Sequence, residues 1–255
     1  MLRQRVSAFI TGRPIEQLLR EAYVTIRELI PDALVSREER KSRRYDELTL
    51  DIARAVMDDT STYVDAGAHA GTMLKHLRHI APRGHGYAFE PIPNLAAGLA
   101  RRFGDVDVIN AALGAANDET TFHVVVGNPS DSSVDERPER TANYEVRDIA
   151  VVVRRLDECV LAQHRVAFIK IDVEGAELAV FRGASRILGE DRPVVVFESS
   201  SLKLAAIMEV LSEHRYGVDL LENFRRRPAP GCDELVELAR DRGEYYFVAS
   251  PLESS

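Results

Sequence analysis

The 255-residue sequence contains only two cysteines, no excess of positive charge and no long apolar run. Cys159 and Cys232 stand in neither a Cys-x-x-Cys nor a zinc-type spacing, which favours two reduced thiols over a disulfide or a metal centre. No stretch approaches the roughly 20 apolar residues of a membrane-spanning helix. The first apolar run ends at Ile10, short of the about 7–15 apolar residues of a signal peptide. We therefore expect a soluble, cytoplasmic protein without a membrane partner.

The balance of charge argues against nucleic acid as a partner. Asp and Glu number 41 against 33 Lys and Arg, which gives a net charge of −8. Binding to a phosphate backbone needs clustered positive charge. Apolar residues make up 45% and charged residues 29% of the chain, as in ordinary globular proteins that bury a full core. These proportions exclude a disordered chain, a collagen-like repeat and a disulfide scaffold.

From about residue 60 the chain alternates short β-rich runs with amphipathic helical segments. The pattern predicts strands at 62–65, 86–90, 106–110, 166–172, 194–198 and 245–250. It predicts helices at 71–80, 92–103, 176–188 and 202–214, and further β runs at 120–126 and 149–153. Such alternation is typical of an α/β fold, with a mostly parallel sheet covered by helices on both faces.

The N-terminal part has a different pattern. Helical spacing over residues 14–30 and 46–58 predicts a helical extension or lid at 1–59, ahead of a main domain at 60–255. The mixed charge run at 36–47 is typical of a solvated face. Two polar stretches in the main domain are expected to be loops, and the first is long enough to act as a lid: residues 127–148 and 222–233.

A turn that contains two glycines follows the first strand of the main domain. It runs Asp65-Ala-Gly67-Ala-His69-Ala-Gly71. Glycine lets the backbone turn sharply and approach a ligand closely. The spacing differs from the Gly-x-Gly-x-x-Gly dinucleotide fingerprint, and a tight turn that binds nothing is the alternative interpretation. The turn therefore indicates a ligand site only in combination with other polar residues nearby.

Glu90 ends the next strand of the same β-α-β unit. A carboxylate at this point lies beside the glycine turn, where it can accept both ribose hydroxyls of an adenosine-type cofactor. A surface carboxylate at a strand end is the alternative. The pairing of Glu90 with the glycine turn favours ribose binding.

Three carboxylates surround a glycine after the apolar strand at 166–172, in Asp172-Val-Glu174-Gly-Ala-Glu177. Open α/β sheets bind ligands beyond the carboxyl ends of their strands. Stabilisation of the following helix explains Glu177 well. It explains Asp172 less well, because Asp172 ends an otherwise apolar strand. Asp172 and Glu174 are therefore candidate catalytic residues.

Several segments, in this order along the chain, resemble the FkbM-type methyltransferases. They are Val64–Ala68, Phe89–Pro91, Asn110–Gly114, Arg155–Asp157, Phe168–Glu177, Phe181–Ala184 and Pro193–Glu198. The resemblance covers about residues 60–200 and implies a class I (Rossmann-like) methyltransferase fold with a seven-stranded sheet. It implies S-adenosylmethionine (SAM) as cofactor, and methyl transfer to a hydroxyl of a sugar or natural product, which makes a small molecule the expected partner. The family usually has Asn in place of His69.

The resemblance also implies roles for individual residues. The first turn would form the pocket for the methionine end of SAM: Asp65, Gly67, Ala68, His69, Gly71 and Thr72. The ends of the next two strands would hold the ribose and border the adenine: Glu90, Pro91, Asn110, Ala111 and Ala112. Asp172 would face the reacting centre with Glu174 beside it. Ser132 and Ser133 resemble a serine pair of the family's variable loop, and would touch cofactor or acceptor.

An aliphatic hydroxyl loses its proton as it is methylated, and a general base contributes roughly 10²–10⁴-fold to such a step. The candidate bases, in order, are Asp172, Glu174 and His69. Asp172 and Glu174, with Asp131, also offer hard oxygen ligands of the kind that magnesium prefers. We favour a site without a metal.

Two other functions remain open. An NAD(P)-dependent oxidoreductase would share the Rossmann-like half and the acidic strand end, but the glycine spacing disfavours it. No Tyr in the sequence is followed four residues later by Lys, so the pair of the short-chain dehydrogenases is absent. A non-catalytic SAM-binding module is the second alternative, because a fold does not fix a function.

Overall fold

The computed structural model describes residues 34–126, 132–133, 144–225 and 228–253. The helix predicted at 14–30 and Asp131 lie outside these residues. In the part of the chain that the structure describes, no helix is both long and apolar enough to cross a membrane.

A seven-stranded sheet forms the centre of the molecule, with the strand order β3-β2-β1-β7-β8-β10-β9. Its strands are β1 (Thr62–Ala66), β2 (Gly86–Phe89), β3 (Val106–Ile109), β7 (Val166–Ile171), β8 (Val194–Glu198), β9 (Tyr216–Leu220) and β10 (Tyr246–Pro251). The first five strands of this order pair in parallel, and β10 runs antiparallel to both of its neighbours. The predicted mostly parallel, seven-stranded sheet is thus confirmed.

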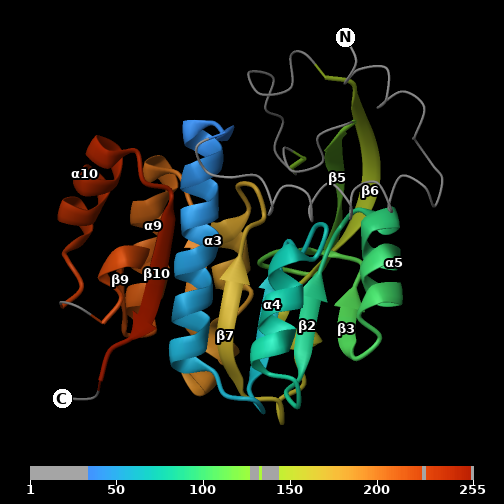
Figure 1. Cartoon of the computed structure of the whole chain (residues 1–255), viewed down its shortest axis with the longest axis horizontal. Coiled ribbons are helices and arrows are strands. Elements are labelled where there is room, and N and C mark those ends of the chain that lie inside the picture. Colours follow the sequence, from blue (N-terminus) through green and yellow to red (C-terminus); the bar gives the residue numbers. More distant parts are fainter. Residues whose placement is uncertain (1–33, 127–131, 134–143, 226–227, 254–255) are drawn as a thin grey trace.

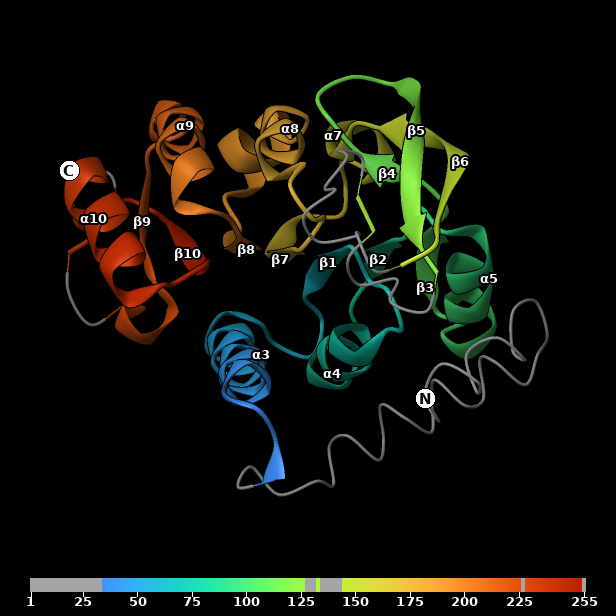
Figure 2. The same ribbon diagram turned by 90° about the horizontal axis from the view of Figure 1, so that it is seen from above.

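Helices cover both faces of this sheet, as seen from above in Figure 2. On one face lie α3 (Arg37–Val56) and α4 (Thr72–Ile80), and on the other α8 (Glu177–Arg182) and α9 (Ser201–Glu213). Three further α-helices lie in the described residues: α5 (Pro93–Arg102), which follows β2, α7 (Leu156–Cys159), and α10 (Cys232–Arg242), which packs on α9.

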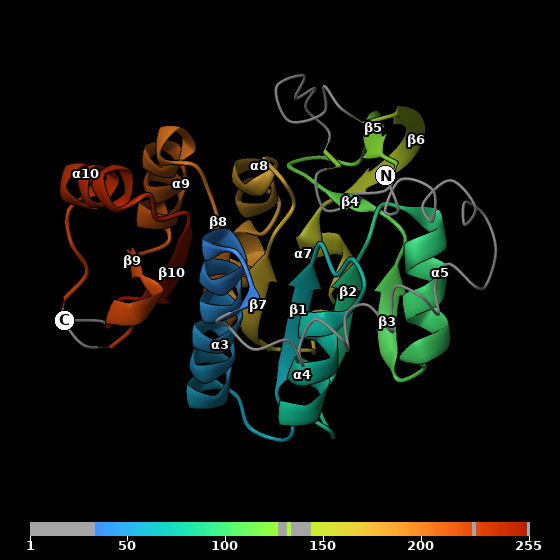
Figure 3. The same cartoon turned by 45° about the horizontal axis from the view of Figure 1, so that its top comes forward.

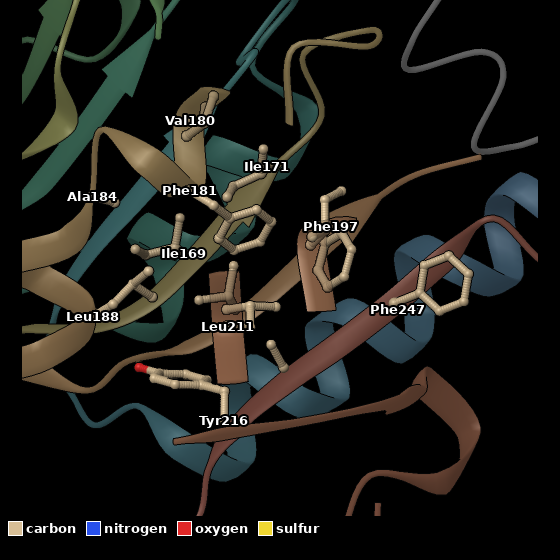
Figure 4. Close-up of a cluster of buried hydrophobic side chains, with 14 of the residues drawn as sticks. Ile169, Ile171, Val180, Phe181, Ala184, Leu188, Phe197, Leu211, Tyr216 and Phe247 are labelled. Carbon is tan, nitrogen blue, oxygen red and sulfur yellow. The ribbon is translucent and has the colours of Figure 1, made fainter. Parts of the chain in front are cut away.

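Alternate residues of the central strands point to opposite faces and build two cores. Ile169 and Phe197 face α8 and α9, where Phe181 meets the Phe197 ring edge-on at 5.1 Å between centroids (Figure 4). Phe168 and Val196 face the other way, into the core beneath α3 and α4. Because β7 and β8 are buried on both sides, their sequences are almost continuously apolar.

A second, three-stranded sheet stands beyond the carboxyl ends of β2 and β3, where Figure 1 and Figure 3 show β5 and β6 rising above the main sheet. Its strands are β4 (Ala112–Leu113), β5 (Asp118–Val125) and β6 (Val146–Arg154). Ser132 and Ser133 lie against β5, since Val125 N donates to Ser132 Oγ at 2.9 Å and Ser133 pairs with His123. The β runs predicted at 120–126 and 149–153 correspond to β5 and β6. The small sheet places Ser132 over the end of the main sheet.

The helix predicted at 46–58 begins earlier, at Arg37. Ser36 caps it, because its Oγ accepts a hydrogen bond from Glu39 N at 3.1 Å. The charge run at 36–47 therefore belongs to the helix and exposes much of its length to solvent. The predicted boundary was wrong because apolar spacing, on which it rested, starts only where the helix reaches the core at Tyr45.

The sequence pattern also did not predict β4, α7, β9 and α10. The sequence of β9 contains Gly217 and Asp219, which are poor strand formers, and α10 begins at Cys232, within a stretch read as a loop. The helix predicted at 176–188 ends at Arg182, followed by a separate π-helical turn at Ile187–Asp191. At the break, Gly183 lies so close to the Gly114 carbonyl oxygen that a Cβ would stand 2.1 Å from it.

Candidate functional site

A cavity of about 590 Å³ opens at the carboxyl ends of β1, β2, β7 and β8. Its walls come from the β1–α4 turn, the strand ends, the small sheet, and one face of α3. The volume falls within the range of small-molecule and cofactor sites. The position, beyond the carboxyl ends of parallel strands, is where open α/β sheets bind ligands.

The β1–α4 turn forms one wall. Gly67 has φ +82°, and a Cβ on it would stand 1.9 Å from the backbone oxygen of Asp172, so only glycine fits there. The amides of Gly67 and Ala68 both donate to Phe89 O at 3.0 Å. Ala68, His69 and Thr72 line the cavity with Gly67.

Gly71 has a different task from Gly67. It has φ +76°, and a Cβ on it would press against Leu99 and Phe103 at 2.6 and 2.8 Å. Gly71 therefore lets α4 start close to α5, and it does not line the cavity. Gly67 thus forms part of the cavity wall, whereas Gly71 allows α4 and α5 to pack closely.

Glu90 lies at the end of β2 and faces the cavity, although it is only 4% exposed. Its carboxylate is fixed by the backbone: Oε2 accepts from His69 N at 2.8 Å and Oε1 from Ile92 N at 2.9 Å. Burial raises the pKa of Glu90 to about 7. Each oxygen keeps capacity for a further hydrogen bond, as contact with a pair of hydroxyls requires.

The residues that follow β3 have two roles: one supports the loop that carries Glu90, and the others line the cavity. Asn110 Nδ2 donates to the carbonyl oxygens of Glu90 and Pro91, at 2.8 and 3.0 Å, and so braces the loop that carries Glu90. Asn110 itself is exposed and outside the cavity, whereas Pro91, Ala111 and Ala112 line it.

Asp65 lies fully buried behind the cavity wall. Within the described residues neither of its carboxylate oxygens has a hydrogen-bond partner, and Oδ1 lies 3.9 Å from Lys170 Nζ. Burial raises the pKa of Asp65 to about 6. An incompletely satisfied buried carboxylate costs free energy, and such groups mark functional sites.

Asp172 is the centre of a hydrogen-bond network. Its Oδ2 accepts from Lys170 Nζ at 3.0 Å and from the Tyr246 hydroxyl at 2.8 Å. Burial by itself would raise the pKa of Asp172, but the Lys170 ammonium and these hydrogen bonds outweigh burial and hold the pKa below its ordinary value. Asp172 is therefore ionised at neutral pH.

Glu198 belongs to the same network. It ends β8, next to Asp172 at the end of β7, and lines the cavity. Burial and the charges of Asp172 and Glu174 raise the pKa of Glu198 to about 9, so it is protonated at neutral pH and hydrogen-bonded to Asp172. Glu198 was not among the site residues predicted from the sequence, although an acidic residue that ends an apolar strand is the same signal that singled out Asp172.

Asp172, Glu174 and Glu198 each offer one oxygen within 4.8 Å of the others. This geometry would suit a divalent ion, but the Lys170 ammonium 3.0 Å from Asp172 opposes one. Glu174 stands at φ +53° and lines the cavity. The neighbouring Glu177 turns back, is 2% exposed and accepts from Gly175 N at 2.7 Å, as expected of a residue that stabilises the helix start.

The last wall comes from the two ends of the described chain. Ser42 and Asp46 of α3, and Tyr245 and Tyr246 at the start of β10, line the cavity. Tyr45 binds the two parts together, since its ring lies 4.9 Å from Tyr245 and 4.8 Å from Tyr246, and its hydroxyl donates to Glu244. No local pattern predicted this wall, because it depends on contacts between segments about 200 residues apart.

Comparison with known proteins relates this geometry to a family. The family model described as methyltransferase FkbM domain matches residues 65–218. The chain is similar in structure to methyltransferase FkbM from Methylobacillus flagellatus KT, with a TM-score of 0.50 and 18% identity, over 76% of this chain and 44% of that protein. This chain thus spans less than half the length of that protein, and the likeness concerns the fold, which is of the class I methyltransferase type.

Two further solved structures are similar to parts of the chain. One is precorrin-6y C5,15-methyltransferase from Geobacter metallireducens GS-15, with 19% identity, a TM-score of 0.41, and coverage of 69% of this chain and 71% of that one. The other is Aeropyrum pernix fibrillarin in complex with natively bound S-adenosyl-L-methionine, with 14% identity, a TM-score of 0.42, and coverage of 80% and 74%. No curated protein matches this chain.

Proposed function

The chain belongs to the methyltransferase FkbM domain family, and on this basis we propose that it is a SAM-dependent methyltransferase acting on a hydroxyl of a small-molecule acceptor, a sugar or a natural product. The observation that carries the proposal is a single cavity, which joins the Gly67 turn and Glu90 to the Asp172 network. One pocket thus offers a place for an adenosyl cofactor and, beside it, the polar groups that a methyl acceptor needs.

The residues of the β1 and β2 ends fit the cofactor. A ligand can approach the backbone at Gly67, where a Cβ has no room. Glu90, held by two backbone amides, would accept the ribose hydroxyls, and Ala111 and Ala112 would border the adenine. The buried carboxylate of Asp65, behind the wall, would favour the positive charges of the methionine end. SAM supplies a methyl group already activated by its sulfonium.

The chain itself would supply alignment and a proton acceptor. Alignment of two reactants at near-attack distance is worth about 7–11 kcal/mol. Asp172 is our first candidate base because it is ionised and held in one orientation by Lys170 and Tyr246. The same donors lower its basicity, which leaves Glu174 as the second candidate and His69, on the β1–α4 turn, as the third.

Membership of the family favours methyl transfer over hydride transfer to a nicotinamide cofactor. A SAM-binding module without turnover is the second candidate function. The network of Asp172, Lys170, Tyr246 and Glu198 favours catalysis, because a module that only bound SAM would have no use for a buried polar network beside the cofactor.

Two measurements on the purified protein test the proposal. Titration calorimetry should detect binding of S-adenosylhomocysteine (SAH), the demethylated cofactor, to the unaltered protein and to Glu119→Gln, an exposed control on β5. Incubation with methyl-labelled SAM and a set of sugars and natural products should then transfer label to a hydroxyl. Absence of SAH binding to intact protein would contradict the proposal, and binding without transfer to any acceptor would favour the module.

A further inference from the structure

Glu198 and Asp172 stand side by side at the ends of two neighbouring strands. The residues just before them, Phe197 of β8 and Ile171 of β7, are paired in the parallel register of the sheet. One carboxyl oxygen of Glu198 lies within 4.8 Å of one of Asp172, and both side chains line the cavity. Two carboxyl groups this close favour a state in which one keeps its proton and donates it to the other in a hydrogen bond.

The contacts around the pair decide which group keeps the proton. The Lys170 ammonium and the Tyr246 hydroxyl both donate to Asp172 Oδ2, at 3.0 and 2.8 Å, and so favour the ionised form of Asp172. Burial, followed by the charges of Asp172 and Glu174, raises the pKa of Glu198 to about 9. Glu198 is therefore the donor, and Asp172 the acceptor, of the hydrogen bond between them.

Three donors thus act on the Asp172 carboxylate. An ionised carboxylate has about four positions at which it accepts a hydrogen bond. Lys170 of β7 and Tyr246 of β10 take two of them, and Glu198 of β8 takes a third. Donors from three strands leave the carboxylate little freedom to turn. The remaining position can accept a proton from a ligand in the cavity, which Asp172 lines.

We infer that Glu198 is a positioning residue for methyl transfer, which through its hydrogen bond to Asp172 turns the open position of that carboxylate toward the acceptor hydroxyl. The inference rests on the proposed function and on Asp172 as the base. In that reaction the acceptor oxygen forms a bond to the methyl carbon as the bond from this carbon to sulfur breaks, and the hydroxyl proton moves to Asp172. Glu198 keeps its own proton, so an amide that donates in its place should serve as well.

Two substitutions of Glu198 test this role. Glu198→Gln keeps a donor, and its kcat should stay within about threefold of that of the unaltered protein. Glu198→Ala removes the donor and should lower kcat by about 10–100-fold, as expected when a catalytic group is misplaced. The affinity for SAH should be the same in both variants, because Glu198 acts through Asp172 and not on the cofactor. Glu213→Ala, at the exposed end of α9, is the control and should leave kcat unchanged.

The rates are measured with methyl-labelled SAM and the sugar or natural product that accepts most label. A loss of kcat in Glu198→Gln as large as in Glu198→Ala would show that the carboxyl group itself is needed, and would overturn the inference. An unchanged kcat in Glu198→Ala would overturn it too, and would leave the proposed function intact. If the unaltered protein transfers no label, the proposed function is refuted and the role of Glu198 with it.

Carbon-13 NMR tests the donor without an acceptor. In full-length protein labelled at the glutamate side-chain carboxyl carbon, the signal that is missing from Glu198→Gln belongs to Glu198. At neutral pH this signal should have the chemical shift of a protonated carboxyl group, and addition of Mg²⁺ should not move it. An ionised Glu198, or a shift on addition of Mg²⁺ that reveals a metal site, would each overturn the inference. This measurement decides the matter even if Glu198→Ala fails to fold.

Discussion

Burial sets the charge state of the individual carboxyl groups around the cavity. Glu90 and Asp65 lie in the interior, and their pKa values rise to about 7 and about 6. Asp172, which is partly exposed to the cavity, keeps a low pKa because Lys170 lies beside it. The carboxyl groups around one cavity thus differ in pKa, as is common where a site holds charged ligands.

The buried Glu90 makes stability depend on pH. Unfolded Glu has a pKa of about 4.3, and folded Glu90 has one of about 7. Between these values the folded state holds a proton that the unfolded state has released, so the free energy of unfolding falls as pH rises. Glutamine cannot lose a proton, so between pH 4 and pH 8 the free energy of unfolding of the unaltered protein should fall by about 1–3 kcal/mol more than that of Glu90→Gln. Urea denaturation at the two pH values measures this.

The same variant should weaken SAH binding by about tenfold or more, because an amide offers one acceptor oxygen to the ribose in place of two. Glu90 would then be a residue whose ionisation lowers stability and whose two oxygens serve binding. If Glu90→Gln binds SAH as well as the unaltered protein, the ribose assignment is wrong.

Asp172 and Glu174 can be separated by kinetics. Asp172→Asn should lower kcat by roughly 10²–10⁴-fold if Asp172 is the base, with little change in SAH affinity. Glu174→Gln should then act mainly on the acceptor KM. Measured with labelled SAM and the best acceptor found, the reverse pattern would transfer the role of base to Glu174.

At the scale of elements, the β1–α4 turn depends on one backbone position. Gly67 combines φ +82° with contact to Asp172 O, so the turn joins the ends of β1 and β7 as well as β1 and α4. The turn therefore fixes the distance between this wall of the cavity and the Asp172 network.

Gly67→Ala should distort this junction. We expect a loss of about 1–3 kcal/mol in the free energy of unfolding, from strain and displacement, together with loss of SAH binding. Gly104→Ala is the matched control, because a Cβ at Gly104 meets nothing within 4 Å. Thermal unfolding and calorimetry on both variants check the difference, and an unaltered SAH affinity in Gly67→Ala would show that the close approach does not serve the cofactor.

At the scale of the whole molecule, α3 belongs to the core beneath the sheet. Ile52 and Ala53 are 3% and 0% exposed, and they share a cluster with Leu74 of α4 and Phe168 of β7. The described part of the expected extension at 1–59 is thus packed with the main domain at 60–255, and it contributes Ser42 and Asp46 to the cavity.

Ile52→Ala tests this integration. The substitution should lower the free energy of unfolding of the entire molecule by about 2–5 kcal/mol and preserve a single transition in differential scanning calorimetry. Glu47→Ala, at an exposed position of the same helix, should have little effect. A main transition unchanged by Ile52→Ala would instead make α3 an independent lid.

The amino-acid sequence by itself determined the fold class and singled out the strand ends at which the candidate site lies. The alternation of apolar runs and the polar strand ends at Asp65, Glu90 and Asp172 are local signals, because each depends only on neighbouring residues. Tertiary structure decided the rest. It joined Glu198 to Asp172 and brought α3 against the start of β10. Such contacts depend on how distant segments pack. The local sequence around a charged or aromatic residue does not specify which distant residue it will contact in the folded protein.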